Sequence, residues 1–148
     1  EIMKKLPDWE LRFDEFIEKY RTREFRWCSW DCILFSNKMV EFMSGESLLP
    51  KKWRTWKNKG EALEQIIKLS KGKGLAQGIQ NAMDLTTGWS KVNLSHLQKG
   101  DVVVYKEQTE LCGIFDGYCC IGPTKRENGN SIVAKQGCNI THAWRLNG

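Results

Sequence analysis

The hydrophobic pattern of this chain changes its period once, close to Gly88. Before that point apolar residues recur at spacings of about three and four, which is typical of amphipathic helices. After Gly100 short apolar runs alternate with turn pairs such as Asp116-Gly117, which is typical of antiparallel strands joined by hairpins. Helices followed by strands predict an α+β fold in which the helices cover one face of the sheet.

Four helices are expected before this change. The first is capped by Asp8 and ends near Thr22. The second begins at Asp31, with Ser29 as a plausible cap, and ends on Gly45 in the left-handed conformation. This second helix carries large apolar residues on one face, so we expect it to be the most buried. The remaining expected elements are helices 61–69 and 75–83 and strands 102–105, 112–115, 118–121, 131–134 and 140–146.

A length of 148 residues fits one domain with one hydrophobic core. We therefore expect a single domain over residues 1–148, with a helical part over 8–85 and a sheet part over 100–146 that forms an antiparallel meander or half-barrel. No stretch approaches the roughly 20 apolar residues of a membrane span, and the first residues lack the apolar run of a secretory signal. We expect no membrane span, and folding in a cytoplasm.

The net charge of +5 arises from 23 basic and 18 acidic side chains spread along the chain. Such a balance favours weak attraction to polyanions over specific nucleic-acid binding. Trp53 and Trp56 lie among basic residues and could stack on bases, but such residues also anchor cores and protein interfaces. Nucleic acid is therefore not the expected partner.

The pair Asp31-Cys32 lies at the expected start of the second helix, where free backbone amides and the helix dipole stabilise negative charge. A thiolate is favoured there, so Cys32 is a candidate nucleophile and Asp31 its neighbour at the helix start. Three interpretations of Cys32 remain open: a small buried thiol, a reactive thiol and a metal ligand.

The chain has six cysteines, which do not indicate a disulfide framework in the absence of a secretory signal. Four of them, Cys28, Cys32, Cys112 and Cys120, could in principle converge on zinc or an iron–sulfur cluster. Their spacing differs from the usual Cys-x-x-Cys pairs. No metal or other cofactor is therefore expected.

Four segments carry a resemblance to known families. Residues 27–35, Trp-Cys-Ser-Trp-Asp-Cys-Ile-Leu-Phe, resemble the element that carries the nucleophile in NlpC-type cell-wall peptidases, and residues 99–105 resemble a strand of the same enzymes. A closer resemblance is to a phage tail-module family of unknown function with the pattern Trp-Gly-x-x-Asp-Cys-x-Leu-Phe. Its later motifs match, in the same order, residues 100–103 (Gly-Asp-Val-Val), 113–117 (Gly-Ile-Phe-Asp-Gly) and 143–145 (Ala-Trp-Arg).

This resemblance implies a papain-like fold of the NlpC type and a structural or assembly role in a phage tail tip or baseplate. The implied location is the virion, after synthesis in the cytoplasm of the bacterial host. The implied partners are other tail proteins, such as hub, distal tail or tail-tip subunits. Bacterial peptidoglycan is a further partner if the peptidase chemistry is retained.

One position departs from the active peptidases. Their catalytic histidine begins a His-x-Gly-Ile-Tyr strand, whereas the matching run here, residues 111–115, begins with Leu111. The resemblance therefore gives Cys32 as a nucleophile without the histidine that shuttles its proton. We expect a pseudoenzyme. The alternative is an active cysteine amidohydrolase or peptidase in which His142 serves as the base, since His96 falls in a polar loop.

Overall fold

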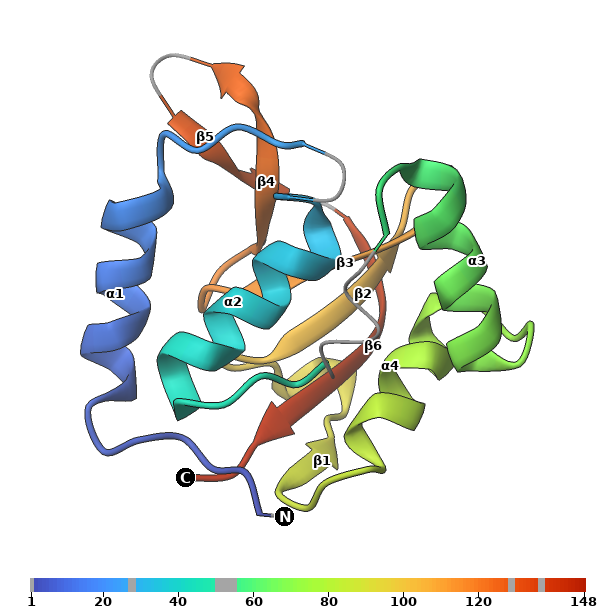
Figure 1. Ribbon diagram of the computed structural model, residues 1–148. Helices are drawn as coiled ribbons and strands as arrows, with labels where there is room; N and C mark the ends of the chain where they lie inside the picture. Colours follow the sequence, from blue (N-terminus) through green and yellow to red (C-terminus); the bar gives the residue numbers. More distant parts are fainter. Residues whose placement is uncertain (1, 27–28, 50–55, 128–129, 136–137) are drawn as a thin grey trace.

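The computed structural model describes residues 2–26, 29–49, 56–127, 130–135 and 138–148 (Figure 1). In these residues, helices precede an antiparallel sheet, which confirms the α+β prediction. The helices are α1 (Trp9–Tyr20), α2 (Cys32–Ser44), α3 (Lys59–Ser70) and α4 (Leu75–Met83), with a 3₁₀ turn η2 (Leu94–His96). The strands are β1 (Trp89–Lys91), β2 (Val102–Lys106), β3 (Glu110–Phe115), β4 (Cys120–Glu127), β5 (Asn130–Lys135) and β6 (Asn139–Leu146).

The six strands lie in the order β1-β6-β2-β3-β4-β5, and every neighbouring pair is antiparallel. Strands β2 to β5 form the expected meander. The last strand does not extend it, because β6 returns to pair with β2, where Trp144 is opposite Val102. The edge strand β1 was not predicted, since its three residues are too few to show an alternating pattern.

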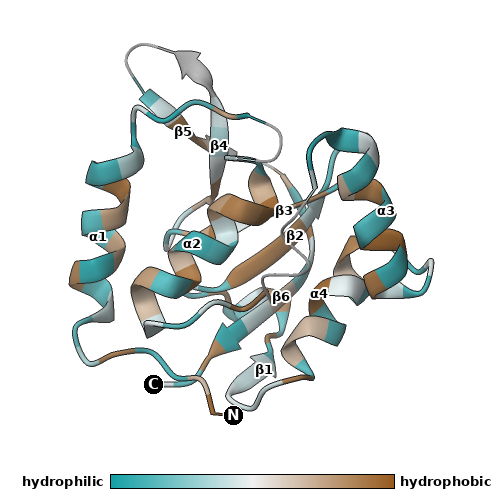
Figure 2. Cartoon of the chain, viewed as in Figure 1, coloured by the Kyte–Doolittle hydropathy of each residue, from teal (hydrophilic) through white to brown (hydrophobic). Residues whose placement is uncertain are grey.

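The helices lie mainly on one face of the sheet (Figure 1). Helix α2 packs directly on β3 and β4, and α4 packs on β3. Helix α1 packs against α2 and reaches β5, while α3 packs on the outside of α4. Figure 2 shows the hydrophobic stretches of α2 and β2 together in the interior of the domain.

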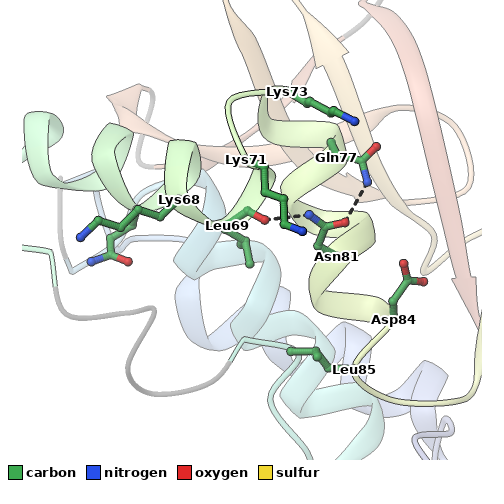
Figure 3. Close-up of a pocket in the computed structure, with 9 residues that line it drawn as sticks. Lys68, Leu69, Lys71, Lys73, Gln77, Asn81, Asp84 and Leu85 are labelled. Atoms are coloured by element: carbon green, nitrogen blue, oxygen red, sulfur yellow. Dashed lines mark hydrogen bonds between the residues drawn. The ribbon is translucent and has the colours of Figure 1, made fainter.

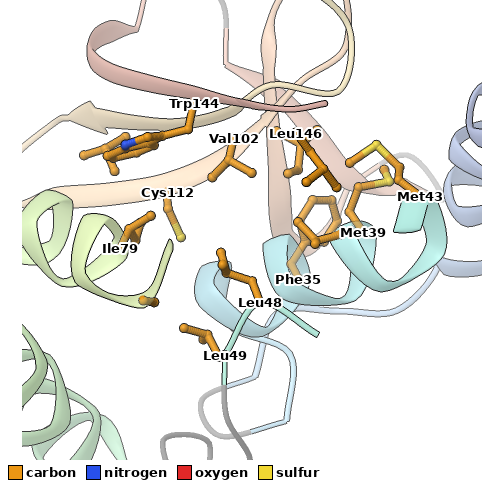
Figure 4. Close-up of a cluster of buried hydrophobic side chains, with 14 of the residues drawn as sticks. Phe35, Met39, Met43, Leu48, Leu49, Ile79, Val102, Cys112, Trp144 and Leu146 are labelled. Carbon is orange, nitrogen blue, oxygen red and sulfur yellow. The ribbon is translucent and has the colours of Figure 1, made fainter. Parts of the chain in front are cut away.

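Helix α2 contributes the largest number of buried residues among the described helices, although the shorter α4 buries a larger share of its own. Phe35, Met39 and Val40 are completely inaccessible to solvent. They face an apolar layer from the sheet and from α4 (Figure 4), which includes Cys112, Val102, Ile79, Trp144 and Leu146. Burial of apolar surface on this scale is the main stabilising term of a domain this size.

The ends of α2 have clear local causes. Asp31 is its N-cap, and the Asp31 carboxylate accepts a hydrogen bond from the backbone N–H of Leu34 at 2.9 Å. The expectation that Ser29 caps this helix is therefore wrong. Gly45 ends the helix with φ +81°, as predicted, because glycine adopts this conformation without a steric penalty.

The face of the sheet that points away from the helices carries a second apolar cluster. Its buried members are Val103, Tyr105, Cys120 and Ala143, with Leu111, Phe115, Cys138 and Ile140 among those packed around them. Alternate residues of β2 and β3 therefore belong to different clusters. None of the described helices has the length and hydrophobicity needed to span a lipid bilayer.

Candidate functional site

Cys32 is the first residue of α2 and is half-buried. Trp30, in the segment before it, is buried in an aromatic cluster between α1 and α2. Its ring centroid lies 4.8 Å from that of Tyr20 and 5.5 Å from that of Phe35. The guanidinium of Arg23 lies 4.3 Å above the Trp30 ring. These contacts anchor the approach to α2, so the position of Cys32 is set by the core.

Asp31 has a structural role at this helix start. Its side chain is fully buried, and besides capping α2 it accepts a hydrogen bond from Nε1 of Trp56 at 2.9 Å. Asp31 therefore ties α2 to the segment that leads into α3. Trp56 itself is buried, so its ring is not available to stack on a base. Trp53 lies outside the described residues.

The side chain that meets Cys32 from the sheet is Cys112 of β3. Cys112 is 1% exposed, and Cys32 packs against the core cluster that contains it. Ser36, one turn after Cys32, donates a hydrogen bond from Oγ to the Cys112 sulfur at 3.7 Å. In Figure 4 Cys112 projects from the sheet toward the helices. The centre is therefore a pair of thiols.

The two thiols differ in acidity. The hydrogen bond from Cys112 lowers the pKa of Cys32, against the opposing effects of burial and of the nearby Asp31 charge. The pKa of Cys112 lies well above its usual range because of its bond to Cys32 and its burial. The start of α2 further favours the anion on Cys32. Cys32 is therefore the thiol that ionises first.

Leu111 does not face Cys32. Its backbone is opposite Tyr105 of β2, and both side chains belong to the cluster on the far face of the sheet. Successive residues of a strand point to opposite faces, so Cys112 takes the position facing the helix. The expectation that a leucine faces the thiol is wrong, although no imidazole faces it either among the described residues.

His142 lies on the correct face of the sheet but in a different place. Val104 of β2 is opposite both Cys112 of β3 and His142 of β6, so the two residues occupy one row with a strand between them. Nδ1 of His142 is 2.9 Å from Oγ1 of Thr141, and the exposed ring stacks on Trp144. Among the described residues, no hydrogen bond joins His142 to Cys32.

The hypothetical four-cysteine metal site is not assembled. Cys112 lies in the core under α2, whereas Cys120 lies in the cluster on the opposite face of the sheet. Both cannot bind one ion. Cys28 is outside the described residues, and the described ones contain no group of three or more cysteine, histidine or acidic side chains arranged around a common centre.

Two of the sequence motifs are joined by an ion pair that the sequence did not predict. Arg145 forms two hydrogen bonds of 2.9 Å with the carboxylate of Asp101, which is fully buried. A further bond runs from Arg145 to the carbonyl of His96 at 2.7 Å. Gly100 has φ +93°, and a β-carbon there would lie 3.0 Å from the ring of Trp9. These motif residues therefore serve the fold.

A family model described as a domain of unknown function, DUF6950, matches residues 4–146. The chain belongs to the DUF6950 family. No protein of curated function matches the sequence. The match covers both the helices and the sheet, so the thiol pair and the Asp101–Arg145 ion pair lie within the DUF6950 domain.

The DUF6950 domain also has an open groove of about 570 Å³ between α3 and α4 (Figure 3). Its floor is a chain of hydrogen bonds in which Gln77 donates to Asn81 and Asn81 donates to the carbonyl of Leu69, at 2.8 and 2.7 Å. Three lysines and one aspartate line it: Lys68, Lys71, Lys73 and Asp84. The sequence showed these lysines but not the groove, which depends on how α3 packs on α4.

Proposed function

We propose that this DUF6950 domain is a non-hydrolytic structural component of a phage tail tip or baseplate, with a papain-like fold. The observation that carries the proposal is that the start of α2, with Cys32, packs on a second cysteine of the sheet, Cys112. The resemblance of four ordered motifs to a phage tail-module family supplies the assembly role.

The proposed papain-like fold rests on one arrangement. In enzymes of that type a cysteine opens a helix that packs on an antiparallel sheet, and the sheet presents the base. Here α2 begins with Cys32 and packs on β3 and β4 of such a sheet. The motif segments at the start of α2, in β2, in β3 and in β6 follow in the same order along the chain.

The chemistry explains why hydrolysis is not proposed. Acyl transfer by a cysteine needs a group that accepts and returns a proton, and this typically contributes about 10²- to 10⁴-fold in rate. The pKa of Cys112 is raised, so this thiol donates a hydrogen bond to Cys32 instead of accepting its proton. A thiol of lowered pKa remains, without the proton shuttle.

The groove between α3 and α4 is the surface that we propose for docking. Its three lysines outnumber its one aspartate, so it complements an acidic segment of a neighbouring tail subunit. Leu69 and Leu85 add apolar lining to the same groove. Protein interfaces commonly combine apolar and polar contacts in this way.

The test of the proposed role is made in the phage or prophage that encodes the chain. The protein is expected in purified tails, and deletion of its gene is expected to give particles that lack complete tails. A Cys32→Ala copy should restore infectivity as well as the wild type does. Tails that assemble and infect normally without the protein would refute the assembly role.

Charge reversal tests the docking surface separately. Lys71→Glu together with Lys73→Glu should prevent incorporation into tails, because the groove would repel an acidic segment. Lys106→Glu, on an exposed residue at the end of β2, is the matched control and should be incorporated normally. Equal incorporation of both variants would rule out this groove as the docking surface.

A second candidate is a cysteine amidohydrolase acting on cell-wall peptide. It is favoured by the lowered pKa of Cys32 and by the position of His142 on the same face of the sheet, one strand beyond Val104. Digestion of purified peptidoglycan separates the two candidates. The assembly proposal predicts no product with wild type, whereas products lost in both Cys32→Ala and His142→Ala would establish the enzyme.

A further inference from the structure

Two cysteines from segments far apart in the sequence lie together at the start of α2. Cys32 opens the helix, and Cys112 comes from the middle of β3. Cys32 packs against the core cluster to which Cys112 belongs. Ser36 fixes the Cys112 sulfur from the next turn of α2. The pair is therefore held by a helix and a strand of the core and not by a loop.

The two members of the pair have different accessibility. Cys32 is half-buried at the helix start, whereas Cys112 is enclosed beneath it. Of the two residues, Cys32 is therefore the one nearer to solvent. This division resembles the two roles needed in thiol oxidation, an attacking thiolate and a resolving thiol.

A second pair of cysteines in the same domain does not lie at a helix start. Cys120 and Cys138 contact each other in the cluster on the opposite face of the sheet. Neither lies at a helix N-terminus, since Cys120 begins β4 and Cys138 precedes β6. Burial raises the pKa of both thiols. This pair supplies an internal control in which the thiols are adjacent but no anion is favoured.

We propose that Cys32 and Cys112 form a peroxide-reactive dithiol that closes reversibly to a disulfide. The substrate class is a small hydroperoxide, such as hydrogen peroxide, and the site is distinct from any role of the domain in assembly.

The reaction balances in two steps. The Cys32 thiolate attacks one peroxide oxygen, the O–O bond breaks, and the leaving hydroxide takes up a proton to give water and the Cys32 sulfenic acid. The Cys112 thiol then attacks the Cys32 sulfur, the S–O bond breaks, and a second water leaves as the disulfide forms. Two thiols are oxidised and one peroxide is reduced to two waters. A thiol reductant reverses the change.

Hydrogen peroxide and the purified domain test this proposal. The protein is treated at neutral pH, quenched by alkylation in denaturant, and analysed by peptide mapping. A loss of about 2 Da with a Cys32–Cys112 cross-link is expected, and dithiothreitol should reverse it. Cys112→Ser should instead accumulate a sulfenic acid on Cys32 that dimedone traps.

Control variants make the result specific. Cys32→Ser should slow the oxidation by about tenfold or more, whereas Cys120→Ser should leave the Cys32–Cys112 cross-link unchanged. Circular dichroism of each variant establishes that it is folded, and the wild-type map needs no variant at all. The proposal is overturned if peroxide leaves Cys32 reduced, joins it to another cysteine, or oxidises Cys120 and Cys138 at the same rate.

Discussion

Cys32 illustrates what could be predicted for single residues. Its place at a helix start follows from local signals, since Asp31 is a good cap and apolar residues follow at helical spacing. Local signals do not predict which residue of the sheet faces Cys32. It depends on the register of β3, and a shift of one residue exchanges the two faces of a strand. The sequence therefore predicts Leu111 on the helix side of β3, where the structure has Cys112.

Gly113 is a residue whose small size is required by packing. A β-carbon there would lie 2.6 Å from both the Cys120 sulfur and the carbonyl oxygen of Ile121. Gly113→Ala should therefore lower the free energy of unfolding by about 2 kcal/mol, measured by urea denaturation. Gly122→Ala is the matched control, because no atom lies within 4 Å of the added carbon. Similar losses in both variants would contradict this reading of β3 and β4.

Arg145 neutralises a carboxylate that has no contact with solvent. Arg145→Ala leaves the charge of Asp101 buried, so we expect the free energy of unfolding to fall by about 3 kcal/mol. Arg12→Ala removes an exposed ion pair with Asp8, which solvent screens, and should have a much smaller effect. The comparison fails if chemical denaturation gives the two variants equal stability.

Secondary-structure elements were predicted where their signals are local. The ends of α2 and α4 agree closely with expectation, because caps and glycines mark them. The strand expected at 118–121 begins later, at Cys120, because the carboxylate of Asp116 accepts the N–H groups of Tyr118 and Cys119 at 2.8 and 2.7 Å and prolongs the turn. The place of β6 beside β2 could not be predicted, since pairing between distant strands leaves no local pattern.

The cap of α2 should matter more than that of any surface helix end, because it also binds Trp56. Asp31→Ala removes the acceptor for Leu34 N–H and for the buried indole N–H of Trp56. We expect a loss of about 2 to 4 kcal/mol in thermal or urea unfolding. Asn58→Ala removes a cap from α3 that binds Glu61 N–H at an exposed site, and should cost about 1 kcal/mol. An equal loss in the two variants would contradict the joining role of Asp31.

Several ionisable side chains of the domain are buried in apolar surroundings. Burial raises the pKa of Cys120 and of Tyr105, and the pKa of Cys112 is also raised. In the unfolded chain these thiols ionise near their usual pKa of about 8.5. A raised folded pKa gives stability that is complete below that value and is lost as the pH increases further. The contribution of Cys32 to the pH dependence of stability has the opposite sign, because the pKa of Cys32 is lowered in the folded state.

The free energy of unfolding should therefore fall as the pH is raised above about 8.5, by up to about 1.4 kcal/mol per pH unit for each such group. Cys120→Ala removes one of these groups, so it should make the fall in unfolding free energy with pH less steep by the contribution of one bound proton. The cavity that it leaves lowers stability at every pH. Urea unfolding in reducing buffer between neutral pH and pH of about 10 measures the slope. A slope equal to that of wild type would contradict the buried, protonated state of Cys120.

We propose that the acidity of Cys32 arises from the start of α2 and from Cys112, and not from an imidazole. The direct test of this proposal is the rate of Cys32 alkylation by iodoacetamide as a function of pH. We expect a single ionisation below the usual value of about 8.5, unchanged in His142→Ala and moved to higher pH in Cys112→Ala. A profile that loses its reactivity at low pH in His142→Ala and is unaffected in Cys112→Ala would instead show that His142 controls the ionisation of Cys32.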